Sequence, residues 1–375
     1  MNENIYRTMI QKRLILFIPS IEGGGVEKNL FIISNYLKDK IKKISVISIS
    51  NKFKNRFSGK IKFISPKAEF WDTIGRRKKF FVGLFLLFLE ILKDRNTLVF
   101  CFQGNVYCTL LCKLLGIKII VRSNSAPDGW SQNKFKHIVF RYVLGSADKI
   151  IVNSLDFKKK FKKKFNINAE CIYNPLNKKE IIKKSKIQNK INFDKKKLNL
   201  INVGRFVDQK DQLTLLKAVK RIRDKIEFNL LLVGRGTERN NLLKYIYENN
   251  LSKQVQLIDF QNNPFNLIKS SDIFILTSLY EGLPNVLLES QVLKKFIIST
   301  NCPTGPREIL LNGKAGFLFD VGDYKKLSNL ILQYSKDKKL LSKKVKIGYQ
   351  NLKRFDFEKN LKSYLKTINS LIYNN

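Results

Sequence analysis

Short runs of apolar, β-favouring residues alternate with amphipathic helical stretches along the whole chain, and this alternation constrains the fold more than any other feature. Residues 177–197, rich in lysine and asparagine, interrupt the alternation, which then starts again. The expected strands are 14–19, 44–50, 61–66, 97–102, 117–122, 149–153 and 170–173, then 198–204, 228–234, 255–260, 272–278, 296–300 and 316–319. The repeated strand–helix order favours the α/β class, with two separate sheets.

The strands and helices are typical of doubly wound parallel sheets. Continuously apolar strands, such as 149–153 and 272–278, suit a parallel sheet that is covered on both faces. The helix expected over 26–37 has its apolar side chains on one stripe, as a helix packed on such a sheet has. We expect one domain over 1–176, a second over 198–355, and a final helix over 356–375 that packs back toward the first domain.

The charge balance bears on the kind of partner. The 71 Lys and Arg residues against 30 Asp and Glu give a formal net charge of +41, which fits a nucleic-acid-binding protein or a membrane-surface protein. The excess is +21 over residues 1–175 and +20 over 176–375, whereas a dedicated nucleic-acid site concentrates its charge. A lysine-favouring codon bias also produces such an even spread.

The cysteines, the single histidine and the length of the apolar runs bear on whether the protein has disulfides, a zinc site, a signal peptide or a membrane span. Five cysteines with no Cys-x-x-Cys pair indicate reduced core residues of a cytosolic protein. The single histidine, His137, cannot build a multi-histidine zinc site, so we expect a surface or packing residue. The apolar run 14–18 is too short for a signal peptide, and 80–92 is too short to span a bilayer. We expect a soluble or peripheral protein.

Candidate ligand-binding residues follow several of the expected strands, at the edge where open α/β sheets bind ligands. Gly23, Gly24 and Gly25 follow the first strand and open a helix, so their backbone could approach an anion closely; a tight turn is the alternative. Arg205 and Lys210 follow the first strand of the second half, and two cations there suit a diphosphate; ordinary surface basicity is the alternative.

The most specific motif follows strand 272–278. Glu281 and Glu289 flank a turn that starts a helix, and the residues between them include Gly282, Leu283, Pro284 and Asn285. Two carboxylates beside free backbone amides suit a ligand with both hydroxyl and phosphate groups. The next strand leads into a loop fixed by prolines and a glycine, from which Arg307 could reach an anion or brace a carboxylate.

These elements, with Gly234 in its Val-Gly-Arg-Gly segment, occur in one order that resembles the retaining glycosyltransferases of family 4. The resemblance covers essentially the whole chain and is strongest over 198–320. It implies the GT-B fold, with two Rossmann-like domains that face each other across a cleft. The first would be the acceptor side, and the second would bind the nucleotide sugar.

The resemblance also implies roles for single residues. Arg205 and Lys210 match the pair that grips the donor diphosphate, Glu281 the acid that contacts the sugar hydroxyls, and Glu289 the acid that binds the ribose. The expected catalytic residues are therefore Glu281, Arg205 and Lys210. The expected donor-binding residues are Gly23, Gly24, Gly25, Gly204, Gly234, Gly282, Leu283, Pro284, Asn285 and Glu289. Many relatives place a histidine after the fifth strand, where this chain has no histidine, so we expect Arg122, Asn124 or Arg307 to contact sugar or acceptor.

The implied reaction is transfer of a hexose or an N-acetylhexosamine from a UDP sugar to a cell-surface glycan precursor on a polyprenyl carrier, with retention. The chain has no Asp-x-Asp motif, so we expect no metal and no cofactor besides the nucleotide-sugar co-substrate. The alternatives are a GT-B nucleotide-sugar epimerase or hydrolase, and a basic nucleic-acid-binding protein. The aromatic residues lie mostly in apolar stripes, which disfavours nucleic acid as a partner.

One segment suggests a further partner. The basic residues 76–79 directly precede the apolar run 80–89, which is the composition of an interfacial membrane helix, and 158–164 form a second cationic run. We therefore expect a cytoplasmic protein, attached peripherally to the anionic inner face of the cell membrane. The alternative is that 80–92 is a core helix, buried between the sheet and its neighbours.

Overall fold

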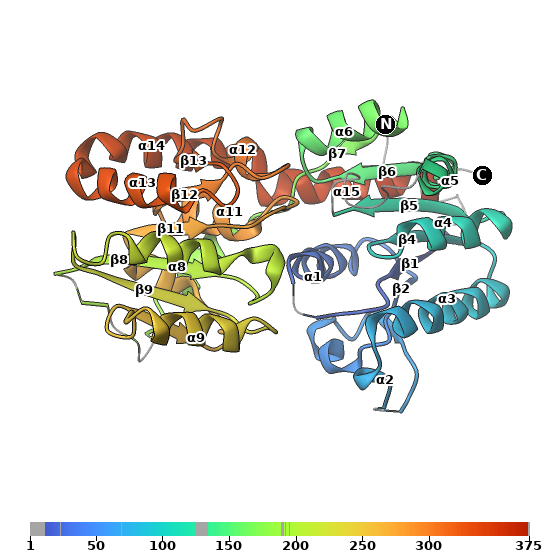
Figure 1. Cartoon of the computed structure of the whole chain (residues 1–375). Coiled ribbons are helices and arrows are strands. Elements are labelled where there is room, and N and C mark those ends of the chain that lie inside the picture. The colour runs from blue at the N-terminus through green and yellow to red at the C-terminus, as the bar shows by residue number, and fades with distance from the viewer. Residues whose placement is uncertain are drawn as a thin grey trace. The chain divides into compact units, whose positions relative to one another are not determined.

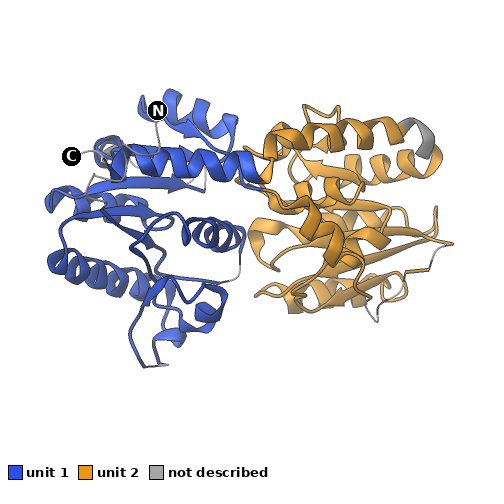
Figure 2. Cartoon of the chain, turned by 180° about the vertical axis from the view of Figure 1, so that it is seen from behind, with its two compact units in different colours: residues 1–175, 358–375 blue, residues 176–357 orange. Residues whose placement is uncertain are grey.

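The computed structural model describes residues 12–22, 24–68, 70–124, 134–188, 191, 193–194 and 196–373. The chain divides into two compact units (Figure 2). Unit 1 comprises residues 1–175 with 358–375, and unit 2 comprises residues 176–357. Each unit contains one sheet with helices packed on it (Figure 1).

The sheet of unit 1 has the order β3-β2-β1-β4-β5-β6-β7, and every pair that the structure describes is parallel. Its strands are β1 (Arg13–Phe17), β2 (Ile44–Ile47), β3 (Lys62–Ile64), β4 (Thr97–Cys101), β5 (Lys118–Ser123), β6 (Lys149–Val152) and β7 (Glu170–Cys171). Its helices are α1 (Gly25–Leu37), α2 (Phe70–Thr73), α3 (Arg76–Lys93), α4 (Asn105–Leu114), α5 (Lys134–Gly145), α6 (Leu155–Phe165) and, from Glu358 on, most of α15 (Phe357–Ile372).

Successive side chains of a strand point to opposite faces of the sheet, so their contacts show which helices cover each face. Val99 and Val121 share a buried cluster with residues of α3, α4, α5 and α6, so these four helices cover one face. Phe100 and Arg122, the next residues along β4 and β5, contact Tyr364 of α15. The final helix therefore covers the other face of this sheet.

The sheet of unit 2 has the order β10-β9-β8-β11-β12-β13, and its described pairs are also parallel. Its strands are β8 (Leu198–Val203), β9 (Phe228–Val233), β10 (Val255–Ile258), β11 (Ile273–Leu276), β12 (Phe296–Thr300) and β13 (Phe317–Phe319). Its helices are α7 (Lys178–Lys184), α8 (Gln212–Lys220), α9 (Arg239–Glu248), α10 (Phe265–Ser270), α11 (Asn285–Val292), α12 (Pro306–Ile309), α13 (Tyr324–Lys336) and α14 (Lys338–Asn351).

The α/β class with two parallel sheets is confirmed. All the strands expected from the sequence are present, most of them a residue or two shorter, because the ends of the apolar runs continue into loops. All five cysteines are free, and only Cys171 is not fully buried. No helix among the described residues is long and apolar enough to cross a membrane.

Candidate functional site

The candidate residues of unit 2 lie along one edge of its sheet. Arg205 follows β8, Gly234 follows β9, and Glu281 follows β11. Arg307 lies beyond the end of β12. Because these strands are parallel neighbours in the order β9-β8-β11-β12, their carboxyl ends lie at the same edge. This is the edge at which open α/β sheets bind ligands, and the predicted positions after the strands are confirmed.

A buried ion pair is the centre of this edge. The Lys210 Nζ donates to the Glu281 Oε1 at 2.5 Å, and the two side chains are 18% and 8% exposed. Lys210 lies at the end of a short 3-10 helix over 208–210, just before α8, rather than in α8 itself. The pair joins the loop after β8 to the loop after β11.

Two hydroxyl groups that the sequence analysis did not single out hold Glu281 in place. The Ser278 Oγ donates to the Glu281 Oε1 at 2.7 Å, and the Thr304 Oγ1 donates to the Glu281 backbone carbonyl at 2.6 Å. Thr304 has a φ of 69°, a left-handed conformation that is uncommon for a residue with a Cβ. Three loops therefore fix the position of this carboxylate.

Cys302 lies in the same loop as Thr304 and is buried. Burial, with a smaller contribution from the negative charge of Glu281, raises the pKa of the Cys302 thiol to about 12. The thiol is therefore neutral at physiological pH and has none of the thiolate character that a nucleophile needs.

Glycines let the loops of this edge pack backbone against backbone. A Cβ on Gly234 would lie 1.8 Å from the carbonyl oxygen of Gly204, and one on Gly305 would lie 1.9 Å from that of Gly282. Gly305 also has a φ of 82°, which favours glycine. Three glycines predicted as donor-binding, at 204, 234 and 282, thus take part in close contacts between neighbouring loops.

The remaining predicted residues of unit 2 differ in exposure. Arg205 is exposed, whereas Glu289, on the second turn of α11, is buried. Leu283 and Pro284 are buried directly before α11, and Asn285 begins that helix half-buried. Exposed Arg205 is thus available to solvent at the edge where Lys210 and Glu281 are mostly covered.

Arg307 has a structural partner close to it in the chain. Its Nε donates to the Asn301 Oδ1 at 2.9 Å across the loop between β12 and α12. This exposed hydrogen bond braces the loop that also carries Thr304.

The glycine-rich loop of unit 1 differs from the anion site that its sequence suggests. Gly23 lies outside the described residues, Gly24 precedes α1, and Gly25 is its first residue. The buried carboxylate of Glu27 turns back toward this loop, where it accepts from the backbone N–H of Glu22 at 3.5 Å. An anion at this end of the helix would therefore meet a carboxylate, which the glycine pattern alone did not indicate.

Arg122 is fully buried, which changes its predicted role. Its Nε donates to the Tyr364 hydroxyl at 3.0 Å, its Nη2 donates to the Asn174 Oδ1 at 2.6 Å, and its Nη1 donates to Asn124. A sugar could touch this guanidinium only if it left these partners. The expectation of a direct contact is corrected: Arg122 links β5 to α15, and half-buried Asn124 is one of its partners.

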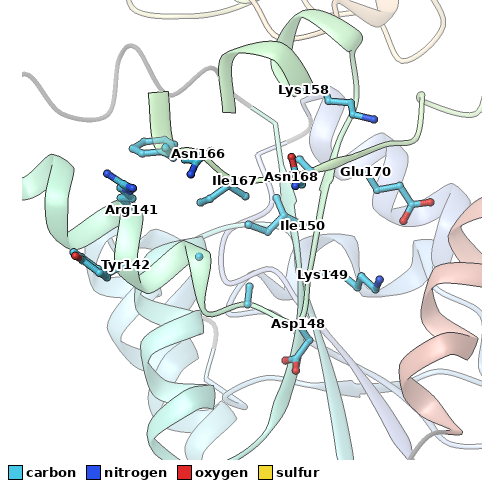
Figure 3. Close-up of a pocket in the computed structure, with 14 residues that line it drawn as sticks. Arg141, Tyr142, Asp148, Lys149, Ile150, Lys158, Asn166, Ile167, Asn168 and Glu170 are labelled. Atoms are coloured by element: carbon cyan, nitrogen blue, oxygen red, sulfur yellow. The ribbon is translucent and has the colours of Figure 1, made fainter. Parts of the chain in front are cut away.

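A hollow of about 780 Å³ lies elsewhere in unit 1 (Figure 3). It lies at the amino ends of β6 and β7, the edge opposite to the one that carries Asn124. Arg141, Lys149 and Lys158 line it; in Figure 3 the charged groups of the two lysines both point to the right, whereas Arg141 lies on the left.

The described residues contain no cluster of three or more His, Cys, Asp or Glu side chains that could hold a metal ion. The ring of His137 stacks on Phe165, with 5.0 Å between the centroids, so it is a packing residue of α5 and α6. The expectation for His137 is confirmed.

Comparisons with known proteins bear on this geometry. Residues 183–354 match the family model of glycosyl transferases group 1. An uncharacterised glycosyltransferase of Methanocaldococcus jannaschii is 30% identical over 66% of this chain and 71% of its own length. An N-acetylgalactosamine-N,N′-diacetylbacillosaminyl-diphospho-undecaprenol 4-alpha-N-acetylgalactosaminyltransferase of Campylobacter jejuni is 26% identical over 69% of this chain and 72% of its own.

The fold has solved counterparts as well. The structure of HepE from Anabaena with UDP and glucose superposes with a TM-score of 0.78 over 96% of this chain and 100% of that one, at 17% identity. This likeness supports the GT-B fold of the two Rossmann-like sheets. Together with the identity to the archaeal relative, it leads to one conclusion: the chain is a glycosyltransferase and belongs to the glycosyl transferases group 1.

Proposed function

We propose that this glycosyltransferase moves a hexose or an N-acetylhexosamine, with retention, from a UDP sugar to a glycan precursor carried on a polyprenyl diphosphate. The single observation that carries the proposal is the buried Lys210–Glu281 pair at the carboxyl edge of the unit 2 sheet. The HepE complex with UDP and glucose supports a UDP sugar as the donor, and the Campylobacter relative's undecaprenol-linked acceptor supports a lipid carrier.

In this proposal, the two cations bind the donor diphosphate. Lys210 has three N–H donors, so it can keep its hydrogen bond to Glu281 and still donate to a phosphate oxygen. Exposed Arg205 supplies a planar fork that matches two phosphate oxygens. Glu281 then accepts from hydroxyls of the transferred sugar, and Glu289 from those of the ribose.

The reaction breaks the bond between the anomeric carbon and the diphosphate oxygen and forms a bond from that carbon to the acceptor oxygen on the same face. The acceptor's proton passes to the leaving diphosphate oxygen, so no histidine base is needed. Negative charge grows on the diphosphate during the reaction, and preorganised cations stabilise it more than they stabilise the intact donor. Lys210 is held in advance by Glu281, which makes it such a preorganised group.

We further propose that the reaction requires no metal, because Arg205 and Lys210 supply positive charge where other enzymes use a divalent cation. The proposed location is the cytoplasmic side of the membrane, where a polyprenyl-linked precursor and a UDP sugar would meet. We do not propose a role in binding nucleic acid.

The test is a panel of UDP, GDP and dTDP sugars, assayed with the purified protein for thermal stabilisation and for nucleoside-diphosphate release with and without lipid-linked acceptors. We expect UDP sugars to stabilise the protein, and the anomeric coupling of the product to show retention. Arg205→Ala should abolish stabilisation, whereas Arg221→Ala, which removes an exposed arginine at the end of α8, should not. Release without any acceptor would indicate a hydrolase, and an inverted product would refute the proposed chemistry.

A further inference from the structure

Three helices on one face of the unit 1 sheet expose apolar side chains to solvent. We call nine of these residues the outer apolar face: Phe81, Phe85 and Leu92 of α3, Tyr107, Leu110 and Leu114 of α4, and Ile138, Val139 and Tyr142 of α5. On α3 and α4 they are three, four or seven residues apart, and on α5 Tyr142 lies four and three residues after the adjacent Ile138 and Val139, so they lie on one side of each helix. The opposite sides of these helices contribute Leu87, Cys108 and Leu144 to the buried cluster on the sheet.

The outer apolar face runs across neighbouring helices. α3 packs beside α4, and α4 packs beside α5, in one layer over the sheet (Figure 1). Each helix contributes a side chain that is about three-quarters exposed: Phe81 at 74%, Leu114 at 76% and Tyr142 at 73%. Large apolar patches on the surface of a domain mark interaction sites.

Two charged residues of α3 are buried although aromatic residues of the same helix are exposed, which is unusual for a helix that faces water. Its only acid, Glu90, is buried and accepts from the Arg13 Nη1 at 2.9 Å. Lys79 is also buried, where it donates to the Ser50 Oγ and to the Asp72 carbonyl, so the predicted basic cluster 76–79 loses one exposed member. Lys79 and Glu90 thus point inward while Phe81 and Phe85 point outward, which leaves two aromatic side chains in water unless the outer side meets an apolar phase.

The basic residues of these helices indicate which kind of partner fits the outer apolar face. The sequences of α3, α4 and α5 contain nine Lys and Arg residues and one acid, the buried Glu90. Arg76, Arg77 and Lys78 are exposed at the start of α3. α6 lies beside α5, as the stacking of His137 on Phe165 shows, and exposes Lys158, Lys159, Lys162 and Lys163. A cationic surface with protruding aromatic side chains is complementary to an anionic lipid interface.

We propose that the outer apolar face docks on an anionic lipid bilayer. Phe81, Phe85 and Leu114 enter the boundary between headgroups and acyl chains, and the basic residues at 76–78 and on α6 contact lipid phosphates. The face then orients unit 1 at the membrane surface. This docking does not depend on which sugar is transferred, and vesicle binding tests it separately from the proposed reaction.

The experiment measures co-sedimentation of the full chain with phosphatidylcholine vesicles that contain increasing phosphatidylglycerol. An apolar variant carries Phe81→Ser, Phe85→Ser and Leu114→Ser. Its control carries Leu243→Ser, Tyr247→Ser and Leu213→Ser, three exposed residues of unit 2, of which the first two have the i, i+4 spacing of Phe81 and Phe85. A charge variant carries Arg76→Gln, Arg77→Gln and Lys78→Gln, and its control carries Lys220→Gln, Lys325→Gln and Lys326→Gln from unit 2.

We expect binding to rise with phosphatidylglycerol content. Loss of three basic residues at the surface should lower the partition coefficient roughly 100-fold, and loss of the three apolar residues should lower it by at least roughly tenfold. Both controls should bind like the wild type. All the substituted side chains are exposed, so thermal melting should be unchanged, and UDP release with a soluble acceptor should persist in every variant.

A second measurement reports insertion directly. An environment-sensitive fluorophore on Leu114→Cys, in a Cys171→Ser background, should shift to the blue with anionic vesicles, whereas the same label on Tyr247→Cys should not. Three results would overturn the proposal: no binding at any lipid composition, equal losses in variants and controls, or an unchanged partition coefficient in the apolar variant. RNA binding that needs the outer apolar face, without vesicle binding, would assign the face to nucleic acid instead.

Discussion

The Lys210–Glu281 pair predicts a specific pattern of stability losses. At 2.5 Å, two unit charges attract each other by about 7 kcal/mol at an effective dielectric constant of about 20, and the cost of removing both from water offsets most of this. Removing one partner of a fully buried pair costs about 3–5 kcal/mol, because the other charge remains without compensation. Lys210 keeps 18% exposure, so we expect about 2–3 kcal/mol for Glu281→Gln and for Lys210→Met.

The double variant measures the coupling free energy between Lys210 and Glu281, apart from the cost of each single substitution. Glu281→Gln with Lys210→Met leaves no isolated charge, so its cost should fall short of the sum of the single costs by about 2 kcal/mol. Both tryptophans, at positions 71 and 130, fall within residues 1–175, so tryptophan fluorescence follows unit 1. Urea unfolding followed by far-UV circular dichroism reports both units, and hydrogen exchange at α8 and α11 reports unit 2.

We expect the losses in unit 2 alone, with the tryptophan transition unchanged. Strictly additive losses would refute the reasoning, because they would mean that the contact contributes no coupling free energy. Ser278→Ala is the comparison at the same carboxylate oxygen: it removes a neutral donor to a charged group, should cost about 1.5–3 kcal/mol, and leaves the ion pair in place.

Four further predictions follow from single features. Arg205→Ala should lower the transfer rate roughly 10²–10³-fold with little change in unfolding free energy, because the side chain is exposed; normal turnover would exclude it from the site. Transfer should persist in excess EDTA, and loss of activity restored by Mg²⁺ or Mn²⁺ would contradict the metal-free proposal. The raised pKa of Cys302 makes the unfolded chain release a proton first, so stability should be complete below about pH 9 and fall by about 1.4 kcal/mol per pH unit toward pH 12; Cys302→Ala should flatten this slope in alkaline urea titrations. Gly234→Ala should destabilise unit 2 by at least about 3 kcal/mol, because its Cβ would overlap the Gly204 carbonyl, and a normal urea midpoint would refute this contact.

The strands were predictable because a parallel strand covered on both faces is continuously apolar, although the apolar runs continue past the ends of most strands. The positions of Arg205 and Glu281 followed from the same feature, since each comes directly after such a strand. The groups that hold Glu281 were not predictable. Ser278 and Thr304 are ordinary polar residues in sequence. Ser278 donates to the Glu281 carboxylate within one loop, whereas the adjacency of β11 and β12 brings the Thr304 hydroxyl to the Glu281 backbone carbonyl.

The burial of Arg122 could not be predicted from the sequence for a different reason. The family resemblance suggested a sugar contact for Arg122, which lies near the end of β5, and an arginine is rarely fully buried. Its partners Asn174 and Tyr364 are 52 and 242 positions away in the sequence, and no local pattern announces them. The final helix supplies the tyrosine, and its packing on this face of the sheet decides that the arginine is enclosed.

The run 80–92 could not be assigned to core or membrane from sequence, because it is apolar all round and its pattern points to neither side. The close packing of α3 at Gly83 determines which side of the helix is buried. A Cβ at Gly83 would lie 2.7 Å from the Pro19 Cβ, so the glycine lets α3 lie close against the segment after β1. That contact fixes the rotation of the helix, with Leu87 and Ile91 buried and Phe81 and Phe85 outside. The sequence alternatives, a core helix and a surface-active helix, are therefore two sides of the same element, and the outer side remains for a partner.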